Sequence, residues 1–162
     1  MSDEKLKEET KKWLQLNLIR NPLNVTLTEK QYLHKTVGKD NRIFKLDELK
    51  SSQNFRHFSN VLNKKVFGNG FYRFNKRLRM LVIREVSHTL RHHLHLIMEQ
   101  PQRYSFEEFK KLIEFVWKKT NFGYSEIHIE KPTNSEREIG WFNYIMKNYN
   151  ENSIDWNNTV LN

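Results

Sequence analysis

Residues 91–97 read RHHLHLI and set histidines at alternating positions of an apolar run. Alternating positions of a β-strand face the same side of a sheet. His93 and His95 are therefore expected to share one face of a strand, where they can bind one metal ion together. His92 and His88 are expected to point away from that face or to lie in the adjoining turn.

A second apolar run, residues 80–84 (MLVIR), ends immediately before Glu85, and polar residues separate it from the histidine strand. This pattern predicts a hairpin in which Glu85 lies opposite His93, at the Cβ separation of about 5 Å found for cross-strand partners. Between residues 51 and 98 Glu85 is the only acidic side chain, against nine Lys and Arg. Two imidazoles and one carboxylate predict a divalent metal site with positions open for water or substrate.

The composition fits one domain over residues 1–162, large enough to bury a core without staples. Aromatic residues make up 13% of the chain and supply bulky core material. The chain has no cysteine, which excludes disulfides and thiolate metal sites. No apolar run approaches the roughly 20 residues of a membrane span, and no signal region is present. We therefore expect an intracellular protein with no membrane span.

A formal charge of +9 and a pI near 9.7 indicate a polyanionic partner, with nucleic acid as the first candidate and an anionic membrane surface as the second. Residues 71–77 (FYRFNKR) alternate aromatic and basic side chains, which suits base stacking beside phosphate contacts. The alternative is that these aromatics belong to the core and the cations are only solvated. The candidate DNA-binding residues are Tyr72, Arg73, Lys76, Arg77, Arg79 and Arg91.

Hydrophobic periodicity predicts the order helix, strand, helix, strand, strand, helix, strand, helix. In the first half of the chain we expect an accessory helix within residues 1–20 (or a partly disordered tail), a strand at 23–29, a loop or short hairpin within 30–45 and a helix at 46–66. The hairpin with Glu85 and His93 follows, and after it a helix from the Ser105 cap to about 121–123, a strand at 124–130 and a helix capped at Thr133 that runs to about 148. Residues 150–162 are expected to form a tail in which Trp156 and Val160 dock on the domain. This order predicts an α+β fold with a mainly antiparallel sheet flanked by helices.

The last predicted helix carries Tyr144 and Lys147 three positions apart, on one helical face, with Gly140 one turn before the tyrosine. A phenol stays protonated at neutral pH and is a weak nucleophile unless a nearby cation or metal favours its phenolate. Lys147 could supply part of that effect or bind a phosphate. The alternative is an ordinary amphipathic helix residue. Tyr149 is about 140° further around the helix, so we do not expect it to act with Tyr144.

These motifs together resemble the HUH endonucleases, in particular the catalytic domains of rolling-circle replication initiators of small plasmids and single-stranded DNA viruses. The resemblance covers residues 22–149 and rests on three motifs in the same order: a hydroxyl-bearing strand at 25–28 (VTLT), the His93-Leu94-His95 strand, and a Tyr144-x-x-Lys147 helix. Glu85 falls where several viral members carry an acidic ligand. The resemblance implies the ferredoxin/RRM-like fold of that family.

The resemblance also implies a function: site-specific nicking and rejoining of single-stranded DNA to initiate rolling-circle replication. Glu85, His93 and His95 would bind Mg²⁺ or Mn²⁺, the only cofactor. Tyr144 would attack the phosphate and leave a 5′-phosphotyrosine, Lys147 would position DNA, and Thr26 and Thr28 would support the sheet floor.

The expected partner is single-stranded DNA of an origin or hairpin. Because no helicase domain follows in this sequence, we expect either a catalytic fragment or a small self-contained initiator, with a separate or host helicase as a further candidate partner. The protein is expected to be a monomer in isolation, located in the cytoplasm of a prokaryote or in the host nucleus if it comes from a eukaryotic virus. A single-tyrosine HUH transposase and a non-catalytic basic nucleic-acid-binding module are the competing interpretations.

Overall fold

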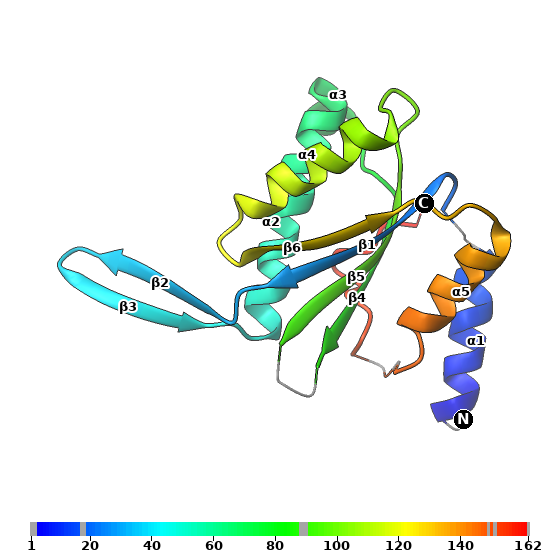
Figure 1. Cartoon of the computed structure of the whole chain (residues 1–162), viewed down its shortest axis with the longest axis horizontal. Helices are drawn as coiled ribbons and strands as arrows, with labels where there is room; N and C mark the ends of the chain where they lie inside the picture. The colour runs from blue at the N-terminus through cyan, green and yellow to red at the C-terminus, as the bar shows by residue number, and fades with distance from the viewer. Residues whose placement is uncertain (1–2, 17–18, 88–90, 149, 151, 162) are drawn as a thin grey trace.

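The computed structural model describes residues 3–16, 19–87, 91–148, 150 and 152–161 (Figure 1). The described helices are α1 (Asp3–Leu16), α2 (Glu48–Phe67), α3 (Asn69–Phe74), α4 (Phe106–Lys118) and α5 (Ser135–Ile145), and the described strands are β1 (Pro22–Glu29), β2 (Tyr32–Val37), β3 (Asp40–Lys45), β4 (Met80–Val86), β5 (His92–Glu99) and β6 (Gly123–Glu130). His88 and Tyr149 lie outside the described residues. No described helix is long and apolar enough to cross a membrane.

Four strands form an antiparallel sheet in the order β4-β5-β1-β6. The chain runs β1, α2, β4, β5, α4, β6, which is the split βαβ arrangement of ferredoxin-like folds. The first and third of these strands lie side by side in the centre, so β4 and β6 are the two edges. The predicted α+β fold, with a mainly antiparallel sheet flanked by helices, is confirmed.

The face of the sheet that packs against α2 and α4 carries the larger core. Period-two alternation sends Leu23, Val25 and Leu27 of β1 into this core, where they are fully buried. Aromatic side chains fill the space between the helices, with the Phe58 and Trp117 rings meeting edge to face at 5.4 Å. The Ser105 capping box with Glu108 begins α4, as predicted.

The opposite face of the sheet packs against α5 (Figure 1). Leu81 and Ile83 of β4 and Ile97 of β5 form a second, smaller core with Phe142 and Met146. The C-terminal tail then runs along the outer edge of β4, which would otherwise expose unpaired backbone groups. Met80 and Val160 exchange two backbone hydrogen bonds there, so Val160 docks as predicted. Trp156, the other predicted docking residue, is half exposed and lies against Trp13.

Four details differ from the sequence-based expectations, and one of them is the end of α4, which is Lys118 instead of about 121–123. Asn134, not Thr133, caps α5, since its side chain accepts a hydrogen bond from the Arg137 amide at 2.9 Å. α5 ends at Ile145 instead of near residue 148, because the Lys147 amide bonds to the Tyr144 carbonyl, three residues back, and so tightens the last turn. Residues 69–74, which the pattern left without a regular structure, form the short helix α3.

Gly123 is where α4 turns into β6, and it leaves no room for a side chain. A Cβ there would collide with the carbonyl oxygen of Trp117 and lie 2.6 Å from Thr120 Oγ1. We expect Gly123→Ala to lower the free energy of unfolding by about 2 kcal/mol, measured by urea denaturation. Gly140→Ala is the matched control: it meets no neighbouring atom and should stabilise the exposed helix by about 0.5–1 kcal/mol. A Gly123→Ala variant as stable as the wild type would contradict this packing.

Candidate active site

The predicted cross-strand pairing of Glu85 with His93 is present: β4 and β5 are antiparallel, and these two residues are register partners. His95 follows on the same face of β5, where its side chain is almost fully buried, and it is the register partner of Thr26 on β1. Three adjacent strands thus bring the carboxylate, both imidazoles and a hydroxyl to one face of the sheet. Period-two geometry sends His92 to the other face, as expected.

His95 is held from both ring nitrogens. Its Nε2 lies 2.6 Å from Glu85 Oε2, and its Nδ1 lies 3.1 Å from Thr26 Oγ1. A neutral imidazole carries one ring proton, and a carboxylate can only accept. With the ring neutral, Nε2–H therefore donates to Glu85 and the Thr26 hydroxyl donates to Nδ1. Thr26 has a role beyond the sheet floor, because it fixes the orientation of the imidazole.

Burial determines the charge state of His95. Removal from water lowers the pKa of His95 below its usual value, and although the hydrogen bond and charge of Glu85 raise it, His93 and Lys147 lower it further. The pKa of His92, on the other face, is also lowered, first by burial. His95 is consequently a neutral imidazole at pH 7, the form that can ligate a metal.

The donor chemistry of Glu85, His93 and His95 suits a divalent cation that takes nitrogen and oxygen ligands. A cation bound between Glu85 and His95 would replace the Nε2 proton, and Nδ1–H would then donate to Thr26, the outer hydrogen bond typical of metal-ligating histidines. Among the described residues, no three His, Asp or Glu side chains converge as a formed metal cluster. Glu85 and His95 are in direct contact, whereas His93 is placed beside them by its register.

Tyr144 faces this cluster from α5. Its ring is 6.1 Å from the His95 ring, centroid to centroid, and its residue is 47% exposed, so the phenol is accessible. The Lys147 ammonium lies over the Tyr144 ring at 4.1 Å from the centroid. Lys147 follows the end of α5, so the two residues do not share a helical face as predicted, but the tight turn still brings them together.

Trp141 completes the support of Tyr144 and was not identified from the sequence. Its ring stacks on Tyr144 with centroids 5.5 Å apart, and it meets His95 edge to face at 5.7 Å. Its indole N–H donates to the Leu96 carbonyl of β5, which ties α5 to the histidine strand. The i, i+3 spacing of Trp141 and Tyr144 on one helix could have revealed this partner.

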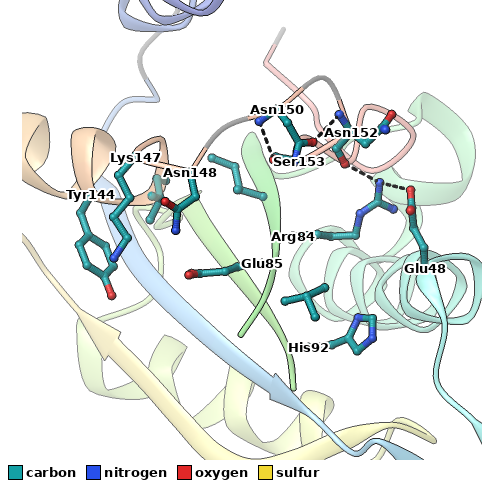
Figure 2. A pocket seen from close by; sticks show the side chains of 13 residues that line it. Glu48, Arg84, Glu85, His92, Tyr144, Lys147, Asn148, Asn150, Asn152 and Ser153 are labelled. Carbon is teal, nitrogen blue, oxygen red and sulfur yellow. Dashed lines mark hydrogen bonds and ion pairs between the residues drawn. The ribbon is translucent and has the colours of Figure 1, made fainter. Parts of the chain in front are cut away.

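Two open cavities meet at the cluster. One, of 610 Å³, is lined by Thr26, Thr28, Glu85, Ser87, His93, His95, Glu126, Ile127, His128, Trp141 and Tyr144. The other, of 530 Å³, extends from Glu85 and Tyr144 past Lys147 to Arg84 and the tail residues Asn150, Asn152 and Ser153. Figure 2 shows Glu85 directed toward Tyr144 and Lys147, while Arg84 points the other way and bonds to Glu48.

The predicted DNA-binding residues do not gather at this cluster, with one exception. Arg91 lies at the cluster's end of the sheet, next to the start of β5, with its guanidinium over the Tyr124 ring. The others are in or beside α3 and the start of β4, and Met80 is five strand positions, or about 17 Å, from Glu85. They are Tyr72, Arg73, Lys76, Arg77 and Arg79. Of these, Arg77 is held by Asn60 and Arg79 lies 3.8 Å from Glu99.

We expect Thr26→Val to weaken Mn²⁺ binding about tenfold, because the substitution removes the hydrogen bond that orients His95. Calorimetric titration with Mn²⁺ measures the affinity. Thr28→Val is the matched control, since Thr28 lies on the same face of β1 and lines the same cavity but has no hydrogen bond to His95. Equal losses in both variants would assign the effect to packing and not to the histidine.

When the chain is compared with known proteins, no family model, no curated protein and no solved structure matches it.

Proposed function

We propose that this protein nicks and rejoins single-stranded DNA through a covalent tyrosyl intermediate, as an HUH-type replication initiator would. The observation that carries the proposal is the meeting of Tyr144 with Glu85, His93 and His95 in the lining of one cavity. An accessible phenol beside a neutral imidazole and a carboxylate combines a nucleophile with ligands for a divalent ion. Mg²⁺ or Mn²⁺, when bound there, would supply charge stabilisation at a phosphate oxygen.

In the cleavage step, Tyr144 would act as the nucleophile and its neighbours would position it. The tyrosyl oxygen of Tyr144 bonds to phosphorus, the bond from phosphorus to the 3′-oxygen breaks, the phenol proton is released and the 3′-oxygen gains one. Trp141 would hold the tyrosine ring by stacking on it, and the Lys147 ammonium would contact the same ring. The phosphodiester energy stays in the phosphotyrosine, so the free 3′-hydroxyl can reverse the step and rejoin the strand.

The extended shape of a single strand suits the two cavities. Both contain Glu85 and Tyr144, so a strand that lies across them would put one phosphate at their junction. On one side the strand would pass Lys147 and the asparagines Asn148, Asn150 and Asn152, whose side chains offer donors to phosphate and base edges.

The test is incubation of the protein with Mn²⁺ or Mg²⁺ and a pool of single-stranded oligonucleotides, followed by denaturing electrophoresis. We expect a metal-dependent protein–DNA adduct that survives denaturation, with a free 3′-hydroxyl on the released strand. Salt-sensitive binding without an adduct under either metal would favour the non-catalytic binding module instead. An adduct formed only by a stable dimer on paired DNA ends would favour a transposase.

A further inference from the structure

The β2–β3 hairpin stands apart from the rest of the molecule. It forms its own two-stranded sheet and projects from the body at the end of β1 (Figure 1). None of its residues is buried, and only Leu33 and Phe44 near its base are even partly covered. Two strands of six residues reach about 20 Å. A two-stranded hairpin without further packing is only marginally stable in water. A projecting hairpin of this kind is therefore expected to be stabilised by a binding partner.

The charge on the hairpin specifies that partner. Residues 30–45 carry five Lys or Arg side chains and one carboxylate, Asp40. Lys35 and Arg42 are direct cross-strand partners, an arrangement that repels unless an anion lies between or beside the two cations. Within the described part of the chain, no ion pair involves either of them. Two adjacent cations without a carboxylate partner suit the phosphates of a polyanion.

The base of the hairpin adjoins the candidate active site. A cavity lined by Gln31, Phe44 and Lys45 of the hairpin region also includes Val86 of β4 and His92 of β5. These two strand residues are the immediate neighbours of Glu85 and His93. Val86 and His92 face the opposite side of the sheet from Glu85 and His93, so a ligand bound along the hairpin would reach the same end of the sheet as Tyr144 and the histidines, on its other face.

We propose that the β2–β3 hairpin binds duplex DNA next to the single-stranded substrate, entering the major groove with Lys35 and Arg42 on the flanking phosphates. The major groove of B-form DNA, about 12 Å wide, admits a two-stranded ribbon. The deep, narrow major groove of duplex RNA does not, so the geometry selects DNA. The inference extends the proposed function, because it places the paired region that borders the cleavage site.

The experiment measures binding of a short DNA duplex, and of its separated single strand, as a function of salt and without metal. For the double variant Lys35→Ala/Arg42→Ala we expect weaker duplex binding, with a slope of log K against log salt reduced by about 1.8 for two lost phosphate contacts. Single-strand binding should stay within twofold. The matched control is Lys111→Ala/Lys118→Ala on α4, which removes the same charge from exposed positions and should leave the slope unchanged.

The inference would be overturned by an unchanged salt slope in the hairpin variant, or by an equal loss of duplex binding in the α4 control. It would also be overturned if the protein bound duplex RNA as well as duplex DNA, or if the hairpin variant lost only its binding to phosphatidylserine vesicles. Replacing residues 33–44 by a short Gly-Ser loop removes no fully buried side chain and should reproduce the loss of duplex binding. This binding experiment involves no metal and no cleavage, so its result is independent of the nicking assay. A protein that forms no adduct can still bind duplexes through the hairpin, and a protein that forms the adduct can still fail to bind duplexes through the hairpin.

Discussion

Tyr144→Phe abolishes the covalent protein–DNA adduct and leaves DNA binding within twofold of the wild type: this is the largest effect we expect. The substitution removes one oxygen and keeps the ring. The stack on Trp141 and the contact with the Lys147 ammonium therefore persist, and only the nucleophile is lost. Denaturing electrophoresis detects the adduct, and fluorescence anisotropy with a labelled oligonucleotide measures binding.

Tyr124→Phe is the control for that experiment. Tyr124 is also exposed and lies at the start of β6, where it contacts Arg91 at the same end of the sheet. Its phenylalanine variant should form the adduct at the wild-type rate. An adduct retained in the Tyr144 variant and lost in the Tyr124 variant would move the nucleophile to β6.

The second large effect that we expect is on the pH dependence of the free energy of unfolding, which Glu29→Gln should reduce strongly. Glu29 is 1% exposed at the end of β1, where its Oε2 accepts a hydrogen bond from Ser51, while its Oε1 has no hydrogen-bond partner among the described residues. Burial raises the pKa of Glu29 to about 7, against smaller lowering effects of the Ser51 hydrogen bond and the Arg84 charge and a raising effect of Asp155. The folded protein thus holds a proton that the unfolded chain releases at lower pH.

The sign of the effect follows from that raised pKa. The contribution of Glu29 to stability is fully present below the unfolded pKa, near 4.5, and is lost as the pH rises through about 7. The difference of about 2.5 pKa units corresponds to roughly 3 kcal/mol. We expect the Gln variant to lack this decline, so the stability difference between variant and wild type should grow by that amount from pH 4 to pH 8, as measured by urea unfolding.

His92 and His95 act in the opposite direction, since their lowered pKa values cost stability as the pH falls below about 6.5. Both histidines are present in the wild type and in the Gln variant, so their effect cancels in the comparison. Glu107→Gln is the matched control, because it removes the same charge from an exposed position of α4 instead of a buried one. Equal profiles for wild type and Glu29→Gln would show that Glu29 does not carry the buried proton.

The strands of the sheet could be predicted because alternation is a local signal. Leu23, Val25 and Leu27 alternate with polar residues along β1, and this single pattern predicts both the strand and its buried face. The register of Glu85 with His93 followed from the length of one hairpin. Ser105 likewise signals the start of α4 within four residues.

The contact that orients His95 joins residues far apart in the chain, and no local pattern encodes it. Thr26 and His95 meet only because β1 and β5 are neighbours in the sheet, although 69 residues separate them. The same is true of the tail pairing with β4. The basic residues around α3 lie at the opposite end of β4 from Glu85, and the composition that suggested them as DNA-binding residues carries no information about that distance.

The most direct test of the account is the identity of the residue that carries the DNA. The metal-dependent adduct is digested with nuclease and protease, and the nucleotide-bearing peptide is sequenced by mass spectrometry. We predict a phosphonucleotide on Tyr144, within the peptide that contains Trp141. A nucleotide on any other residue, or no adduct with either Mg²⁺ or Mn²⁺ across the oligonucleotide pool, would contradict the assignment of this site.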